Sequence, residues 1–246
     1  MVCICYHHDG DADLQVLFKT IQNIKASYDF NVHIVIHTNS DASKQVLMQH
    51  DANMEVIVAS NMQHPHHLAW QHRSYIKHHL HEHDVVMYLE HDIIITGAQV
   101  NNYLENIMHM WPHYCPALVR YERSCDGTMY AVEVTPATCK NRCIIHLNDV
   151  YMNVGKIYSA CWILPTHFLK QVVTDDFCKI PPRLHLTREY AASFVNWTLR
   201  LPLLMQLNAD GKRISPRCLI YHASNKYIND QKQCNFSKHR VADLLS

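Results

Sequence analysis

Short apolar runs alternate with amphipathic segments through the first part of the chain. Each apolar run has the length and composition of a buried strand, and the segments between them repeat hydrophobic residues at helical intervals. This order of strand, helix, strand, helix and strand is typical of a parallel sheet with right-handed crossovers. The pattern predicts strands at residues 2–6, 31–37 and 54–59, and helices at 12–27 and from about 41 to 50.

A further apolar run, residues 85–96, carries two acids in its middle, Glu90 and Asp92. A helix predicted at 66–82 leads into it. Two residues apart on an extended chain, both carboxylates would point the same way, toward the crevice where parallel sheets bind ligands. Carboxylates at such a place can hold a hard divalent cation, which can in turn hold a diphosphate. On spacing alone, acids of a turn or a helix cap are an equal alternative.

The second part of the chain has a different pattern. Alternating β segments at 115–158 suggest antiparallel strands. No repeat, low-complexity block or linker is evident, so we expect one domain over residues 1–246 that consists of two halves, 1–112 and 113–246. The remaining predicted elements are helices at 97–111, 165–173 and 187–199 and a strand at 217–221.

Composition narrows the class of function. The chain has 246 residues, with 22 Lys plus Arg against 22 Asp plus Glu, so there is no basic field to attract nucleic acid. Only five glycines occur, and neither a dinucleotide-binding fingerprint nor a P-loop is present. Bound phosphate would therefore depend on metal and side chains. No signal peptide or membrane-length apolar run is seen, which predicts a cytoplasmic protein without a membrane segment.

A histidine follows the last predicted strand. His222 begins a run that continues through Ser224, Asn225, Lys226 and Tyr227. An imidazole followed by hydrogen-bond donors and a cation suits a metal-bound diphosphate. Alone, His222 would more often be a surface histidine at a strand end.

Several motifs occur in an order that is more specific than any one of them. The chain resembles the small GT-A glycosyltransferases of large DNA viruses (chlorella-virus type), which have relatives in fungi and plants. The matching segments are His64-Pro65-His66-His67-Leu68-Ala69-Trp70-Gln71-His72-Arg73, Glu90-His91-Asp92, Arg120-Tyr121-Glu122, Arg188-Glu189-Tyr190-Ala191-Ala192-Ser193 and His222 to Tyr227.

The resemblance implies a fold and an activity. The fold would be the Rossmann-like GT-A fold, an α/β/α sandwich with a mainly parallel central sheet and a smaller antiparallel acceptor-side region. Residues 1–112 would be its nucleotide-binding half, and residues 113–246 its acceptor-binding half with a C-terminal metal and diphosphate loop. The activity would be transfer of a sugar from a nucleotide-diphosphate donor, expected to be a UDP-sugar, to a glycan or glycoprotein acceptor, with inversion. Mn²⁺ or Mg²⁺ would bridge enzyme and diphosphate. The donor sugar, the base, the acceptor and the choice between inversion and retention stay open.

The resemblance also suggests roles for individual residues. The metal ligands would be Asp92 and His222, with Glu90 beside the metal or the ribose. The acceptor hydroxyl would be deprotonated by Glu189, for which Glu122 and Asp126 are rivals and an exposed Arg188–Glu189 ion pair is the structural alternative. The other residues expected to hold the nucleotide are Arg73, Asn225, Lys226 and Tyr227 at the diphosphate and Tyr6 and Asn39 at the nucleoside.

A zinc site is the main alternative. His78, His79, His81 and His83 cluster near a predicted helix end, where His79 and His83 would share a face and could chelate zinc. The zinc-peptidase spacing His-Glu-x-x-His is missing, which argues against a zinc peptidase. The alternatives to the transferase are a zinc-binding hydrolase and a non-catalytic carbohydrate- or nucleotide-binding module.

Overall fold

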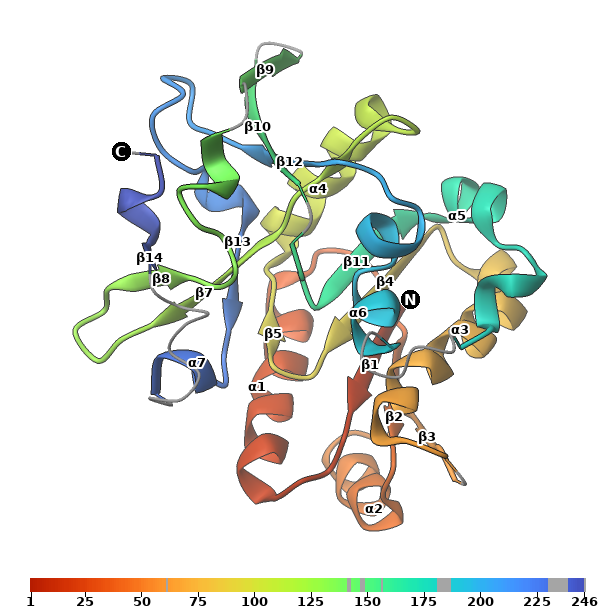
Figure 1. Ribbon diagram of the computed structural model, residues 1–246. Coiled ribbons are helices and arrows are strands. Elements are labelled where there is room, and N and C mark those ends of the chain that lie inside the picture. Colours follow the sequence, from red (N-terminus) through yellow and green to blue (C-terminus); the bar gives the residue numbers. More distant parts are fainter. Residues whose placement is uncertain are drawn as a thin grey trace. The chain divides into compact units, whose positions relative to one another are not determined.

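The computed structural model describes residues 1–60, 62–140, 143–146, 149–155, 157–180, 187–229 and 239–245 (Figure 1). The chain forms two compact units. Unit 1 comprises Met1–Asp92 and Ala160–Phe194, and unit 2 comprises Ile93–Ser159 and Val195–Ser246. These units differ from the halves at 1–112 and 113–246, and a single domain stays a prediction.

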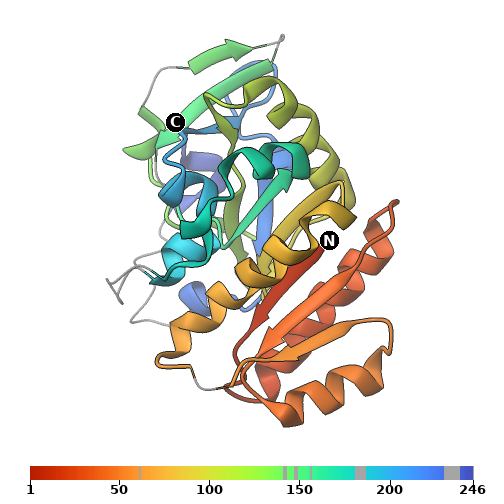
Figure 2. The ribbon, with the colours of Figure 1, turned by 90° about the vertical axis from the view of Figure 1, so that its right-hand side faces the viewer.

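Unit 1 is built on one mainly parallel sheet, as the sequence predicts. The strand order is β11-β4-β1-β2-β3, in which β1 to β4 run parallel and β11 is antiparallel to β4. Figure 2 shows β1, β2 and β3 side by side in red to orange. The strands are β1 (Val2–Tyr6), β2 (Ile34–Thr38), β3 (Glu55–Val58), β4 (Val85–Glu90) and β11 (Cys161–Pro165).

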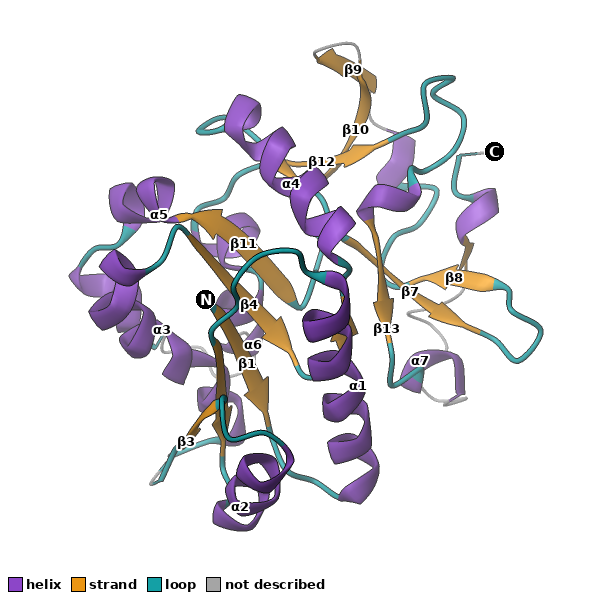
Figure 3. Cartoon of the chain, turned by 180° about the vertical axis from the view of Figure 1, so that it is seen from behind, coloured by secondary structure: helices purple, strands orange, loops and turns teal. Residues whose placement is uncertain are grey.

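The order of these strands creates a switch point. From β1 the chain moves outward to β2 and β3, and then returns to β4 on the other side of β1. Right-handed crossovers consequently place α1 and α3 on opposite faces of the sheet, as Figures 1 and 3 show on the two sides of β1. Ligands of α/β folds bind at the carboxyl ends of such strands. The helices of unit 1 are α1 (Asp11–Ser27), α2 (Asp41–His50), α3 (Leu68–His79), α5 (Thr166–Val172) and α6 (Thr187–Ala192).

The core of unit 1 follows from its hydrophobic pattern. Helix α1 buries Leu14, Leu17, Ile21 and Ile24, whose side chains are 9% exposed or less. Burying one such side chain contributes about 2 kcal/mol. The spacing of these four residues therefore accounts for both the helix and the face that it turns to the sheet.

Unit 2 contains two sheets. Their strand orders are β6-β12-β10-β9 and β14-β8-β7-β13-β5, and β13 lies parallel to β7 and antiparallel to β5. Helix α4 begins with a capping box formed by Thr96 and Gln99. The elements are α4 (Gly97–Met110), α7 (Lys226–Asn229), β5 (Ile93–Ile94), β6 (Cys115–Pro116), β7 (Val119–Arg123), β8 (Met129–Ala131), β9 (Cys143–His146), β10 (Asp149–Gly155), β12 (Leu203–Gln206), β13 (Leu219–His222) and β14 (His239–Arg240).

The structure corrects the sequence prediction in several places. The run 85–96 is not one strand: β4 ends at Glu90, a turn follows at His91 and Asp92, and β5 belongs to a different sheet. Strands β11 and β12 were not predicted. The helix predicted at 187–199 is α6 followed by a π-helical turn, Phe194–Thr198. None of the described helices has both the length and the apolarity needed to cross a membrane.

Candidate functional site

Polar side chains of unit 1 meet at the carboxyl ends of three neighbouring strands. The Tyr6 hydroxyl lies 3.1 Å from His8 Nδ1, and the Tyr6 ring contacts the His91 ring edge-on at 5.4 Å. The backbone N–H of His8 donates to Asn39 Oδ1 at 2.8 Å, while Asn39 Nδ2 lies 3.3 Å from His7 Nε2. Tyr6 and Asn39, both predicted to line a nucleoside pocket, thus belong to one cluster that joins the ends of β1, β2 and β4.

The acids Glu90 and Asp92 lie at the end of β4 and just beyond it. Glu90 is 9% exposed and Asp92 is 2% exposed. Arg188 Nε lies 3.7 Å from Glu90 Oε1, so α6 begins beside the carboxyl end of β4. Burial of carboxylates is costly unless a positive charge or hydrogen bonds compensate it. Because the turn follows Glu90, the premise that both acids point the same way from one extended strand is wrong.

The predicted base, Glu189, follows Arg188 on α6 and is half-buried. Its Oε2 atom is buried and has no hydrogen-bond partner among the described residues. The rival Asp126 lies in unit 2, where hydrogen bonds from Ser124 and Thr128 lower its pKa to about 2. A carboxylate of such low pKa accepts a proton poorly at neutral pH. Between these two acids, Glu189 is the better candidate for the base.

Arg73 has an interior position in unit 1. Its side chain is 1% exposed, and its guanidinium donates to the carbonyls of Phe177 at 3.0 Å and Tyr190 at 2.7 Å. It also lies 4.0 Å above the Trp70 ring. Burial lowers the pKa of Arg73 to about 9. The contacts tie α3 to the chain around α6, and a role at a diphosphate stays a prediction.

In unit 2, His222 is held between an acid and a hydroxyl. Its Nδ1 lies 2.6 Å from Glu122 Oε1, and its Nε2 lies 3.2 Å from Ser224 Oγ. The Tyr227 ring stacks on the imidazole at 5.2 Å. His222 and Glu122 are both fully buried. His222 is therefore an interior residue at the end of β13, not a surface histidine.

Glu122 is committed to this arrangement. Besides His222, it accepts the backbone N–H groups of Tyr227 at 3.1 Å and Ile228 at 2.6 Å. Burial opposes ionisation, but the hydrogen bonds from His222, Tyr227 and Ile228 outweigh it and hold the pKa of Glu122 below its usual value. With both oxygens accepting hydrogen bonds, Glu122 is a weak candidate for the general base. The signal in the sequence for the contact of Glu122 with His222 was an acid within the segment that forms β7.

The remaining predicted residues of unit 2 lie beside His222. Asn225 adopts a left-handed conformation (φ 46°), and its side chain accepts from the Arg123 N–H at 3.0 Å and donates to the Tyr221 hydroxyl at 2.8 Å. Lys226 Nζ lies 5.4 Å from the Tyr227 ring centroid. Ile93 of β5 pairs with His222 of β13, and Asp92 is the residue before Ile93.

Within the described ranges, no group of three or more His, Cys, Asp or Glu side chains is arranged to hold a metal ion. The basis of the zinc alternative is wrong, because α3 ends at His79 and His83 follows in extended conformation, so the two do not share a helix face. Mg²⁺ sites commonly use one or two protein carboxylates with phosphate oxygens and water, and Asp92 is a buried carboxylate of this kind. His222 would add an imidazole through Nε2, since its Nδ1 lies against the Glu122 carboxylate.

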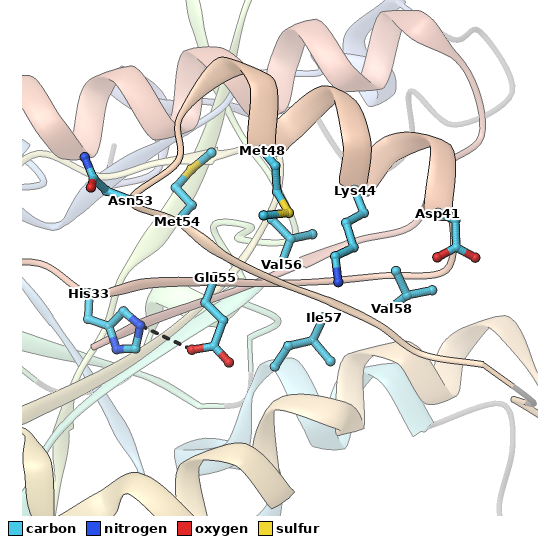
Figure 4. A pocket seen from close by; sticks show the side chains of 10 residues that line it. All are labelled: His33, Asp41, Lys44, Met48, Asn53, Met54, Glu55, Val56, Ile57 and Val58. Carbon is cyan, nitrogen blue, oxygen red and sulfur yellow. Dashed lines mark ion pairs between the residues drawn. The ribbon is translucent and has the colours of Figure 1, made fainter.

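Two cavities lie away from the predicted residues. One of about 670 Å³ is lined by α2, β3 and the residue before β2, with the His33–Glu55 ion pair at 3.4 Å (Figure 4). The other, about 550 Å³, lies in unit 2 beside the end of α4 and is mostly apolar. No predicted site residue lines either one.

No protein-family model matches the chain, and no curated protein matches it. Among solved structures, the chain is similar to S. aureus TarS 1–349, with 14% identity, a TM-score of 0.46, and coverage of 92% of this chain and 61% of that one. It is also similar to the mannosyltransferase PcManGT of Pyrobaculum calidifontis in complex with GDP-Man and Mn²⁺, with 10% identity, a TM-score of 0.42, and coverage of 90% and 56%. A third structure is a CMP:2-keto-3-deoxy-manno-octonic acid synthetase complexed with CTP, with 9% identity, a TM-score of 0.44, and coverage of 82% and 87%.

Proposed function

We propose that the chain is a divalent-metal-dependent glycosyltransferase that moves a sugar from a nucleotide-diphosphate donor, a UDP-sugar, to a hydroxyl of a glycan or glycoprotein acceptor with inversion. One observation carries this proposal most directly. Tyr6, Asn39 and the Glu90–Arg188 pair gather at the carboxyl ends of β1, β2 and β4, where the strand order of unit 1 has its switch point. The likeness to viral enzymes stays a prediction from motifs.

The cation ligands in this proposal are Asp92 and His222, with Glu90 beside the metal or the ribose. Asp92 is a buried carboxylate, and it directly precedes Ile93, the strand partner of His222. The resident cation is Mn²⁺ or Mg²⁺, since these ions take carboxylate oxygens and phosphate oxygens together. When bound, the cation neutralises the negative charge that grows on the leaving diphosphate.

The chain's own side chains perform the remaining tasks in the proposal. Tyr6 and Asn39 bind the nucleoside. Lys226 and Arg73 add positive charge at the diphosphate, and Asn225 and Tyr227 help to orient it. Glu189 accepts the proton of the acceptor hydroxyl as its oxygen bonds to the anomeric carbon, opposite the leaving nucleoside diphosphate.

The test is release of nucleoside diphosphate from a panel of nucleotide sugars with Mn²⁺, in the presence of candidate glycan acceptors. Asp92→Asn should abolish Mn²⁺-dependent donor binding and turnover while the protein stays folded, because loss of a buried charge without its metal need not destabilise the chain. Asp29→Asn, the same change at an exposed position, is the matched control. Full turnover by Asp92→Asn would refute the site assignment.

Metal content separates the proposal from the zinc alternatives. A transferase site of this kind should gain its cation together with the nucleotide, so the purified protein should contain little metal. Stoichiometric zinc in the purified protein would contradict the proposal.

A further inference from the structure

The proposed function uses His222 but gives no role to the two side chains that contact its ring in unit 2, Glu122 and Ser224. Three contacts of Glu122 involve its carboxylate oxygens: Oε1 with His222 Nδ1 and the Tyr227 N–H, and Oε2 with the Ile228 N–H. Backbone N–H groups can only donate hydrogen bonds. Both oxygens of Glu122 are therefore already acceptors before His222 is considered.

This arrangement decides which nitrogen of the imidazole carries the proton. Because Glu122 Oε1 acts as an acceptor toward Tyr227, the 2.6 Å contact with His222 is best made by Nδ1–H donating to the carboxylate. A neutral imidazole with its proton on Nδ1 has a lone pair on Nε2. That lone pair faces the Ser224 hydroxyl, which lies 3.2 Å away and can donate to it.

Packing also fixes the position of the His222 ring. His222 is completely buried, the Tyr227 ring stacks on it at 5.2 Å, and its strand is paired on both sides by β5 and β7. Histidines that bind metal commonly donate their second ring N–H to a carboxylate, which fixes the tautomer and the ring orientation. In unit 2, the Glu122 carboxylate and His222 Nδ1 lie in this arrangement, 2.6 Å apart.

We propose that Glu122 is the positioning residue for His222, because its carboxylate holds the imidazole in the Nδ1–H tautomer. Nε2 is then the atom presented to the divalent cation. Until the cation binds, the Ser224 hydroxyl donates a hydrogen bond to the Nε2 lone pair. This inference rests on the proposed function. The same carboxylate binds the N–H groups of Tyr227 and Ile228, so it also links the metal ligand to the segment of Asn225, Lys226 and Tyr227 assigned to the diphosphate.

The tautomer can be measured in the metal-free protein. With ¹⁵N-labelled histidine, the two ring nitrogens of His222 are assigned by comparison with His222→Gln, which lacks them. The expected spectrum of the neutral ring has a protonated Nδ1 and an unprotonated Nε2. A proton on Nε2 would overturn the inference whether or not the chain is a glycosyltransferase.

Metal binding then tests the ligand atom. Addition of Mg²⁺ with UDP, which keeps the sample diamagnetic, should move the Nε2 resonance of His222 while Nδ1 keeps its proton. If Mg²⁺ and UDP bind and Nε2 does not move, the ligand assignment is overturned. If neither Mg²⁺ nor UDP binds although Nδ1 carries the proton, the proposed function fails. The ligand role of Nε2 then fails as well.

A substitution tests the positioning role. In Glu122→Gln, the NH₂ of the amide must face either the Ile228 N–H or His222 Nδ1. If it donates to Nδ1, it favours the Nε2–H tautomer, in which Nε2 has no lone pair for the cation. We expect Mn²⁺ affinity in the presence of UDP to fall about 10- to 100-fold, measured by electron paramagnetic resonance. Glu105→Gln, the same change at an exposed position of α4, should keep the wild-type affinity.

Unchanged Mn²⁺ affinity in a folded Glu122→Gln protein would overturn the positioning role. If this variant does not fold, the tautomer and the Nε2 shift in the wild-type protein still decide the matter. Covalent labelling of Ser224 by a fluorophosphonate would also contradict the inference, because Nε2 would then act as the base for a serine nucleophile.

Discussion

The core of unit 1 should lose stability in mild acid because of a histidine in its sheet. His37 lies on β2 and is 2% exposed, and its Nδ1 has no hydrogen-bond partner among the described residues. The Tyr75 ring contacts it edge-on at 6.1 Å. Burial lowers the pKa of His37 to about 4, and the carboxylate of Glu55 opposes this effect only in part. His37 is therefore neutral in the folded protein at physiological pH.

The sign of the pH effect follows from this lowered pKa. The unfolded chain takes up a proton at His37 near pH 6.5, whereas the folded protein does so only near pH 4. Stability is thus fully present above about pH 6.5 and falls as the pH drops toward 4. The difference between the two pKa values corresponds to about 3.4 kcal/mol in total, of which about 2 kcal/mol is lost by about pH 5.

His72 acts in the same direction. Burial, followed by the nearby charges of Arg73 and His37, lowers the pKa of His72 well below 6.5. Its ring lies 4.2 Å from that of Tyr88 on β4. Because both histidines lie in the same core, the variant that tests His37 is compared with the wild type at each pH. The pH dependence that burial of His72 causes is then common to both proteins.

The assay is urea unfolding at about pH 7.5 and about pH 5. His37→Gln removes the titrating group, so the loss of stability between the two pH values should be about 2 kcal/mol smaller than in the wild type. His81→Gln is the matched control, because the His81 side chain is 72% exposed. Equal pH dependence in the wild type and in His37→Gln would refute the reasoning.

Three further variants test other parts of the structure. Glu189→Gln should lower turnover about 10²- to 10⁴-fold with donor affinity unchanged, and a large loss of donor affinity would instead place Glu189 in the nucleotide pocket. Arg73→Met should lower the free energy of unfolding by about 3 kcal/mol, because the buried carbonyl of Phe177 and the part-buried carbonyl of Tyr190 lose this donor. Arg213→Met, at an exposed position, is its control, and equal stability of the two variants would contradict the structural role of Arg73. Thr96→Ala should cost about 1 kcal/mol in urea unfolding by removing the cap of α4, and no change would show that the cap is not needed.

The sequence predicted the parallel sheet of unit 1 well, because short apolar strands alternate regularly with amphipathic helices. The α/β class with a mainly parallel central sheet is confirmed, and β1 has the predicted bounds. Strand β11 was not predicted, because its antiparallel pairing with β4 depends on residues 72 to 80 positions apart in the chain, from Cys161 with Leu89 to Pro165 with Val85. Periodicity within a segment carries no information about such a partner.

The site shows the same division between local and long-range information. Tyr6 and Asn39 could be assigned to one end of the sheet because the ends of neighbouring parallel strands meet. The turn after Glu90 was not predicted, since the apolar residues on both sides continue the same pattern. The pairing of Glu122 with His222 joins residues 100 positions apart, so the sequence offered Glu122 only as a rival base.

The central claim is that the chain binds a divalent cation and a nucleoside diphosphate together. Calorimetric titration of UDP into the protein, with and without Mn²⁺, measures this coupling directly. The account predicts that Mn²⁺ tightens UDP binding by about tenfold or more and that Asp92→Asn removes the gain. UDP binding of equal strength with and without Mn²⁺ would contradict the account.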